Sequence, residues 1–207
     1  MTSEATVFVV DDDAAVRDAL KALLESDGLT AEIFGTGQEF LDAHDADGDG
    51  CLLLDVQMPD MNGLELQQKL ADNGSSLPVI IITGHGDVPI AVKALKAGAV
   101  DFIEKPFTDE VILGSVRRAL EFGKKHRRKQ ASMNEAKAGI VRLTTREYEV
   151  FELLAVGRLN KQIAGDLGIS SRTVEVHRAR VMEKMEAHNL AHLVRMALAL
   201  GIGPELP

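Results

Sequence analysis

The sequence predicts an α/β protein, in which a doubly wound, parallel (βα)5 sheet precedes a smaller all-helical domain. Short apolar runs alternate with amphipathic stretches through the first 122 residues, and from residue 143 onward the pattern is helical without a strand signal. A chain of 207 residues accommodates two domains of ordinary size. We therefore expect domains at residues 1–122 and 141–207, with residues 123–140 forming a basic helical extension or linker between them.

Five apolar runs are the predicted strands, at residues 6–10, 30–34, 51–54, 78–82 and 100–103. The third and fourth are apolar throughout, as is typical of strands buried on both faces. Between the runs, apolar side chains recur at helical spacing, as Val16, Leu20 and Leu24 do. Alternating strands and helices need crossover connections, so the sheet should be parallel, with polar functional groups at the carboxyl ends of its strands.

Charge is distributed unevenly along the chain. Counting Lys and Arg as positive and Asp and Glu as negative, the net charge is −15 for residues 1–122, +5 for 123–140 and +1 for 141–207, which sum to the total of −9. An acidic domain repels phosphate backbones, so nucleic-acid contacts are expected from the later segments. The basic cluster at 123–140 either keeps a linker extended and solvated or adds phosphate contacts.

The N-terminal sequence MTSEATVFVV has no basic leader before an apolar run, and no stretch approaches the roughly 18 apolar residues of a membrane span. We therefore expect a cytoplasmic protein without a membrane partner. The single cysteine, Cys51, excludes an intramolecular disulfide, and its place in an apolar run predicts a core thiol.

Polar side chains follow four of the predicted strands and should meet at one edge of the sheet. They are Asp11, Asp12 and Asp13 after the first strand, Asp55 after the third, Thr83 after the fourth and Lys105 after the fifth. Clustered carboxylates repel one another unless a cation neutralises them, and oxygen ligands favour Mg²⁺. Each acidic residue alone could equally be a turn former or a helix cap, as Asp13 could be.

This set of groups suits phosphoryl transfer. The Asp55 carboxylate can attack a phosphoryl donor, while Mg²⁺ and the Lys105 ammonium neutralise charge on the transferred oxygens and Thr83 donates a hydrogen bond. The segments VFVVDDDAAVR, LLLDVQMPDMNGLEL, VIIITGHGD and KAGAVDFIEKPF resemble the receiver domain of bacterial two-component response regulators, over about residues 5–122.

The resemblance implies that Asp55 is phosphorylated and that Thr83 and Lys105 sense the phosphoryl group. It also implies a Mg²⁺ site, a cis Lys105–Pro106 bond, a switch aromatic and a dimer face on the fourth and fifth helices. The implied Mg²⁺ ligands are Asp11, Asp12, Asp55 and the Gln57 carbonyl. The implied switch aromatic is Phe102, which by its sequence position alone would be taken for a core residue. The implied dimer face carries Val92 and Lys96.

A second motif lies in LNKQIAGDLGISSRTVEVHRARVMEKM, which divides at Gly168. A short helix at 160–167, a turn, and a longer helix capped by Ser170 or Ser171 predict a helix-turn-helix. The second helix should bury Val174, Val181, Met182 and Met185.

The outward side chains at the start of that second helix suit base and phosphate contacts. Glu175 can accept from cytosine, Arg178 can donate to guanine and Val176 can contact a thymine methyl, with Ala179 beside them. The predicted phosphate contacts are Lys161, Arg172, Thr173, His177 and Arg180. The alternative is an ordinary surface helix with mixed charges.

Residues 141–203 resemble the LuxR-type DNA-binding domain, whose last helix supplies a dimer contact. The two domains together resemble the FixJ/NarL class of response regulators, and their sequences are most similar to its nitrogen-fixation members. The resemblance implies an oxygen-sensing, FixL-like haem histidine kinase, promoter DNA, RNA polymerase and a homodimer after phosphorylation. Relatives that respond to styrene, tetrathionate or dicarboxylates share much of this sequence. Glu175 is acidic where some relatives have lysine, so their promoter sequence is not expected to carry over.

Three functions compete at this point. The first is a transcription activator gated by phosphorylation of Asp55, which is no enzyme beyond its own phosphoryl transfer and slow dephosphorylation. The second is a Mg²⁺-dependent phosphohydrolase that uses the same aspartate as nucleophile and turns over repeatedly. The third is a DNA binder that ignores phosphorylation, which the complete set of pocket residues disfavours.

Overall fold

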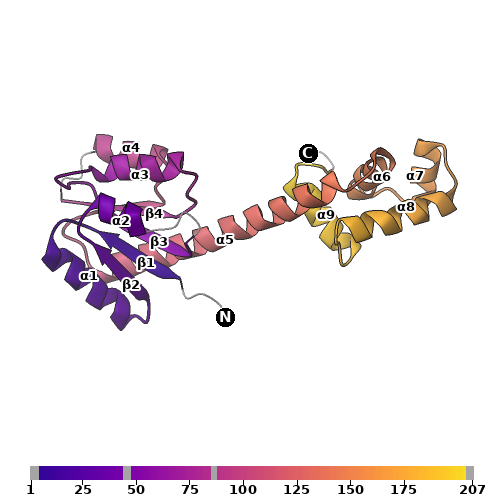
Figure 1. Ribbon diagram of the computed structural model, residues 1–207. Coiled ribbons are helices and arrows are strands. Elements are labelled where there is room, and N and C mark those ends of the chain that lie inside the picture. The colour runs from indigo at the N-terminus through magenta and orange to yellow at the C-terminus, as the bar shows by residue number, and fades with distance from the viewer. Residues whose placement is uncertain (1–4, 44–47, 85–87, 204–207) are drawn as a thin grey trace. The chain divides into compact units, whose positions relative to one another are not determined.

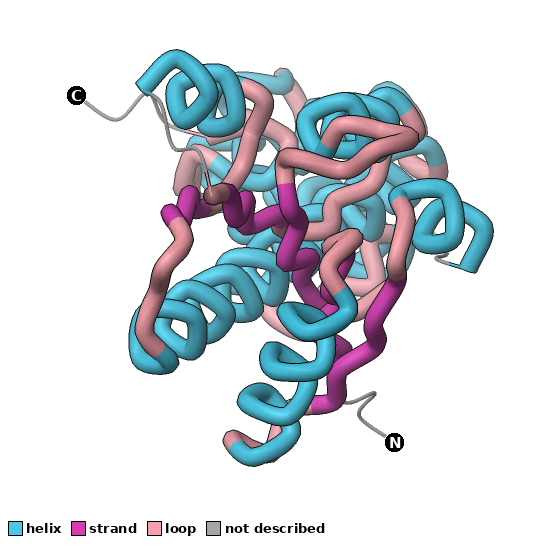
Figure 2. Tube along the Cα trace, turned by 90° about the vertical axis from the view of Figure 1, so that its left-hand side faces the viewer, coloured by secondary structure: helices cyan, strands magenta, loops and turns pink. Residues whose placement is uncertain are grey.

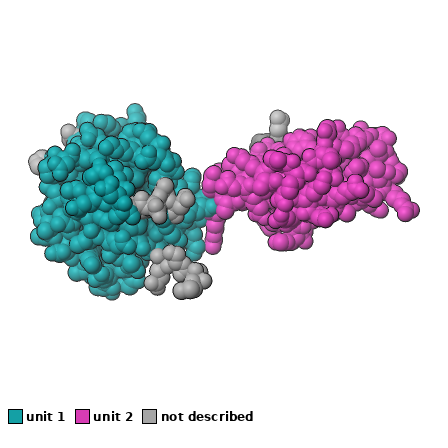
Figure 3. All heavy atoms as spheres, in the orientation of Figure 1, with its two compact units in different colours: residues 1–127 teal, residues 128–207 magenta. Residues whose placement is uncertain are grey.

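The computed structural model describes residues 5–43, 48–84 and 88–203 (Figure 1). By its internal contacts the chain divides into two compact units, unit 1 at residues 1–127 and unit 2 at residues 128–207 (Figure 3). No helix in the described ranges is long and apolar enough to cross a membrane.

Unit 1 contains the predicted parallel sheet. Its strands are β1 (Thr6–Val10), β2 (Thr30–Phe34), β3 (Gly50–Asp55), β4 (Val79–Thr83) and β5 (Asp101–Glu104), in the spatial order β2-β1-β3-β4-β5. Every adjacent pair is parallel. Strand β3 is buried at all six positions and β4 at all five, as the unbroken apolar runs predicted. The doubly wound fold is confirmed.

Helices cover both faces of this sheet (Figure 2). One face packs against α1 (Ala14–Ser26) and α5 (Asp109–Val141), through a cluster that includes Leu24 and Val116. The other face packs against α2 (Gly37–Ala43), α3 (Gly63–Asp72) and α4 (Val88–Lys96), through a cluster that includes Phe40 and Leu66. Since the strands are parallel, their carboxyl ends lie together at one edge of the sheet.

Helix α5 runs without a break through the segment at 123–140, which was expected as an extension or linker. Lysine, arginine, alanine and glutamine all favour helix, so a segment with few apolar residues still forms one. Its last part belongs to unit 2, because Ala136 is fully buried in the core of that unit and Ile140 packs against the same core.

Unit 2 consists of that end of α5 with α6 (Thr145–Ala155), α7 (Asn160–Leu167), α8 (Ser171–Lys184) and α9 (Leu190–Ala199). Phe151, Ile163, Val174 and Val181 are fully buried at its centre. Of the apolar stripe on α9, Leu193 and Ala197 are in this core while Leu198 is half exposed. The apolar stripe of α9 is therefore divided between the core of unit 2 and its surface.

A capping box begins α6. The Thr144 hydroxyl accepts from the Glu147 backbone, and the Glu147 carboxylate accepts from the Thr144 backbone N–H at 2.8 Å. The same carboxylate accepts from Lys184 Nζ at 2.6 Å and is 2% exposed. These bonds lower the pKa of Glu147 to about 2, chiefly through Lys184. The T-x-x-E spacing carries the cap signal, but nothing in the sequence indicates Lys184 as partner.

Candidate functional site

The strand ends bring the predicted polar residues to one edge of the sheet. Asp11 directly follows β1, while Asp55 and Thr83 are the last residues of β3 and β4. Lys105 directly follows β5, and its peptide bond to Pro106 is cis. Parallel pairing in register sets these ends side by side, so residues far apart in sequence become neighbours.

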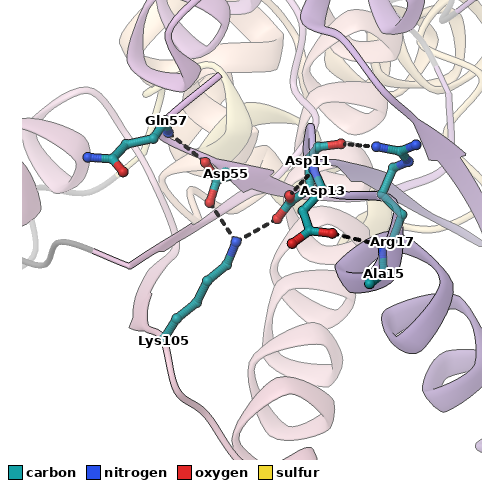
Figure 4. A network of polar contacts seen from close by, with 7 residues as sticks. All are labelled: Asp11, Asp13, Ala15, Arg17, Asp55, Gln57 and Lys105. Atoms are coloured by element: carbon teal, nitrogen blue, oxygen red, sulfur yellow. Dashed lines mark hydrogen bonds and ion pairs between the residues drawn. The ribbon is translucent and has the colours of Figure 1, made fainter. Parts of the chain in front are cut away.

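Lys105 joins two of the acidic residues. Its Nζ lies 2.7 Å from Asp11 Oδ2 and 2.8 Å from Asp55 Oδ1 (Figure 4). Both carboxylates are buried, with 2% and 5% of the residue exposed. One ammonium thus faces two buried carboxylates, and the cluster keeps a net charge of about −1.

Burial controls the protonation of this cluster. Removal of the Asp55 carboxylate from water raises its pKa, against the lowering effect of the Lys105 hydrogen bond. Burial by itself would lower the pKa of Lys105, but its hydrogen bonds to Asp11 and Asp55 raise it above the ordinary value. The lysine therefore stays charged at neutral pH, as a group that stabilises an incoming anion must.

Backbone groups fix the two carboxylates. The Gln57 N–H donates to Asp55 Oδ2 at 2.5 Å, and the Asp13 N–H donates to Asp11 Oδ1 at 2.9 Å (Figure 4). Asp13 itself caps α1 by accepting from the Ala15 N–H at 2.8 Å, the alternative its sequence position allowed. Each carboxylate thus keeps one oxygen toward Lys105 and one toward the backbone.

Two further residues that sequence reasoning missed support this edge. Arg17 donates from Nη1 to the Asp11 carbonyl at 2.7 Å. A Cβ on Gly63 would lie 2.1 Å from the Asp55 carbonyl oxygen, so only glycine fits beside the end of β3. The N-G pair before α3 signals a turn, but its packing against Asp55 is a tertiary contact.

The remaining predicted residues of unit 1 lie at different depths. Asp12 is exposed, whereas Thr83 is 1% exposed. Phe102 is half-buried on β5 and packs against the core on the α2–α4 face. Val92, 43% exposed, and Lys96 both lie on the outer surface of α4.

The donor set for a metal is partly assembled. Within residues 5–43, 48–84 and 88–203, no three acidic, histidine or cysteine side chains are close enough to hold an ion. Asp11 and Asp55 are joined through Lys105, and Asp12, the residue after Asp11, is exposed. The groups present are carboxylate and backbone oxygens with excess negative charge, which suits Mg²⁺ rather than a softer metal.

Helices α7 and α8 form the predicted helix-turn-helix. Gly168 ends α7 in the left-handed conformation at φ 65°, and Ser170 caps α8 by accepting from the Thr173 N–H at 3.1 Å. Val174, Val181 and Met185 are fully buried, as the spacing predicted, whereas Met182 is only partly buried against the same core. The buried stripe holds α8 in place and leaves the opposite side of its N-terminal half in solvent.

That outward side carries the predicted contact residues. The side chains of Arg172, Glu175, Val176 and Ala179 line one shallow hollow, and Lys161 and Arg180 are also exposed. Two predicted contacts are engaged within the unit, and a third is partly buried. Arg178 donates to Asn160 at 3.2 Å, the Thr173 hydroxyl bonds Ser170, and His177 has a buried Nδ1 without a hydrogen-bond partner in the described structure.

Comparisons with known proteins agree with this architecture. Residues 7–117 match the model for the response regulator receiver domain, and residues 141–197 match the model for bacterial regulatory proteins of the luxR family. A receiver sheet with a LuxR-type helix-turn-helix defines a response regulator that binds DNA. The chain belongs to this family, the response regulators with a LuxR-type DNA-binding domain, and is FixJ-like.

Several relatives are similar over nearly the full chain. The transcriptional regulatory protein FixJ of Azorhizobium caulinodans is 48% identical, over 99% of this chain and 97% of its own. The response regulator protein TmoT of Ectopseudomonas mendocina is 45% identical over 93% and 88%. Among solved structures, full-length FixJ from B. japonicum has a TM-score of 0.60 at 43% identity and covers 97% of this chain and 98% of its own. The response regulator StyR has a TM-score of 0.78 at 40% identity and covers 95% of this chain and 99% of its own.

Proposed function

We propose that this chain is a transcription activator gated by phosphorylation of Asp55 and active in the bacterial cytoplasm, where its DNA lies. Response regulators pair with sensor histidine kinases and bind DNA. The observation that carries it is the buried Asp55 carboxylate, held by Gln57 and paired with Lys105 at the open edge of the sheet.

The chemistry follows from these contacts. An Asp55 oxygen attacks the phosphorus of a kinase phosphohistidine; the new O–P bond forms as the P–N bond breaks, and the histidine leaves with the electron pair. The Lys105 ammonium, already 2.8 Å from Asp55, neutralises the transferred oxygens, and Thr83 donates to one of them.

Receiver domains generally bind Mg²⁺ at the phosphorylation site. In this chain Asp11, Asp12, Asp55 and the Gln57 carbonyl would hold it. When bound, the ion supplies positive charge to the phosphoryl oxygens and offsets the repulsion between the two buried carboxylates.

Phosphorylation then shifts unit 1 toward a form that dimerises. Thr83 is drawn to the phosphoryl group and Phe102 moves further inward, which changes the surface of α4 and β5. The apolar exposure of α4 supports this surface: Val88, Val92 and Leu95 are 75%, 43% and 50% exposed, with Lys96 beside them. Two joined chains present two helix-turn-helix motifs at a high effective concentration.

On DNA, we propose that Glu175, Val176, Arg178 and Ala179 contact bases and that flanking cations contact phosphates. Arg178 would have to exchange Asn160 for a guanine. The proposed phosphate contacts are Lys161, Arg172, Thr173, His177 and Arg180. The domains proposed for these tasks are residues 1–122 and 141–207, with 123–140 connecting them.

The proposed pathway is nitrogen fixation under low oxygen, with a FixL-like oxygen-sensing kinase upstream and RNA polymerase downstream. FixJ proteins of three rhizobial species are 43–48% identical to this chain. TmoT and TodT are 45% and 44% identical, so the alternative is a FixJ-like regulator of another pathway.

One experiment tests gating directly. The full chain and Asp55→Asn are incubated with acetyl phosphate and Mg²⁺, and phosphate per chain, mass in solution and binding to a random duplex library are measured. We expect one acylphosphate per wild-type chain, a dimer, and selection and footprinting of a paired site, all absent from the variant. A variant that dimerises and binds as the wild type does would refute gating, and many phosphates released per chain would indicate the phosphohydrolase instead.

A further inference from the structure

Helix α5 leaves unit 1 over the two strands that carry the phospho-acceptor and Thr83. Asp49 directly precedes β3, whose last residue is Asp55, and Pro78 directly precedes β4, whose last residue is Thr83. Both residues contact α5. Arg127 forms an ion pair with Asp49, and Gly123 lies against the Pro78 ring. The helix is therefore seated on the far ends of the strands that form the site.

The Asp49 side of this contact is firmly held. The Asp49 carbonyl accepts from the Thr6 N–H at 2.9 Å, which ties it to the start of β1. A Cβ on the next residue, Gly50, would lie 1.9 Å from the Thr6 carbonyl oxygen, so the chain can pass there only as glycine. Any movement of β3 along its axis thus moves Asp49 with it.

The α5 side explains a residue that is otherwise unfavourable. Glycine weakens a helix interior, yet Gly123 lies within α5. A Cβ there would be 2.9 Å from Pro78 Cγ and 3.1 Å from Arg127 Nη1, so the missing side chain makes room for both partners. The side chains of Arg127 and Asp49 are 29% and 38% exposed, so solvent screens their ion pair in part.

We infer that Asp49, Pro78, Gly123 and Arg127 form an exit clamp, which transmits the phosphorylation state of the β3 and β4 ends to helix α5. The inference rests on the proposed gating by Asp55. Strands β3 and β4 are buried along their whole length, so small displacements at one end are carried to the other rather than absorbed. Without the clamp, α5 can hinge at Gly123, and the displacement is lost before residue 128.

The test compares the response to phosphorylation in clamp variants of the full chain. The response is the ratio of dissociation constants, without and with acetyl phosphate, for the duplex footprinted by the wild type. We expect Asp49→Asn and Arg127→Gln each to lower this ratio about two- to fivefold, with equal phosphorylation of Asp55. Their double variant should lose no more than either alone, and the charge reversal D49R/R127D should recover the ratio.

Matched controls separate the clamp from nonspecific effects. Arg128→Gln removes a neighbouring, exposed cation and should leave the ratio unchanged. Gly123→Ala should lower the ratio, while Gly114→Ala, whose Cβ would meet only Arg118 Nη1 at 3.4 Å, should not. Hydrogen exchange should rise in residues 123–127 of the clamp variants only.

The outcomes are distinguishable from failure of the gating proposal. An unchanged ratio in both Asp49→Asn and Arg127→Gln, with a responsive wild type, overturns the clamp. Unphosphorylated variants that bind DNA more tightly than the unphosphorylated wild type also overturn the clamp, because the contact would then restrain α5 and would not transmit the phosphorylation state to it. A wild type that does not respond to acetyl phosphate overturns the gating by Asp55 instead.

Discussion

The buried pair of Glu147 and Lys184 gives the sharpest stability prediction. Glu147→Gln keeps the size of the side chain and an oxygen that accepts from the Thr144 N–H, but removes the anion that Lys184 contacts at 2.6 Å. The pKa of Glu147 falls from 4.5 to about 2 in the folded chain. Such a shift corresponds to about 3 kcal/mol, and we expect about 2 kcal/mol because Lys184 is partly solvated.

The pH dependence follows from the direction of the shift. A lowered pKa means that the folded state prefers the carboxylate, so this stability is fully present above pH 4.5 and is lost as pH falls toward about 2. The free energies of unfolding of the wild type and Glu147→Gln should therefore differ most at neutral pH. The difference should shrink below pH 4.5 and vanish near pH 2.

Urea unfolding followed by tyrosine fluorescence measures this difference, because Tyr148 is the single tyrosine, lies on α6 in unit 2, and has no tryptophan to compete with it. We expect the midpoint to fall by about 1–2 M at neutral pH. Glu149→Gln is the matched control, since its ion pair with Arg146 is 38% exposed on both sides. Equal losses in the two variants, or a loss that persists at pH 2, would refute the buried-pair argument.

Three further predictions concern both units. Gly63→Ala should destabilise unit 1 by about 2 kcal/mol or more and slow phosphorylation, because its Cβ would press on the Asp55 carbonyl. Thermal melts and labelling with acetyl phosphate measure the two effects, and wild-type stability and labelling would contradict this packing. Burial raises the pKa of Cys51 to about 12, so an alkylating reagent should react only as fast as unit 1 unfolds. Arg172→Gln should weaken binding to all duplexes and reduce the salt slope by about 1, whereas Glu175→Gln should change the preference at one base pair.

Local pattern predicted most of the fold. The apolar runs in β3 and β4 predicted buried parallel strands, and the spacing around Gly168 predicted two helices and a tight turn. Helix α2 has no comparable stripe and was not located. The sequence does not decide whether residues 123–140 continue α5, because the segment favours helix but has too few apolar residues to show which face would pack.

The candidate site was predictable as a set of residues but not as a geometry. Strand ends alone place Asp11, Asp55, Thr83 and Lys105 together, because parallel strands share one carboxyl edge. They do not reveal that Lys105 bridges the two buried carboxylates while Asp12 is exposed. That choice depends on side-chain packing at the edge.

The sequence by itself determined the class of fold, the helix-turn-helix and the place of the aspartate that we propose as phospho-acceptor, because each depends on spacing within a short segment. Tertiary structure alone decided the pairings of Glu147 with Lys184 and of Asp49 with Arg127. Those partners are separated by 37 and 78 residues, and such contacts exist only after the cores on either side have formed. Periodicity reports which face of an element is buried, whereas ionic partners are selected by the positions that packing gives them.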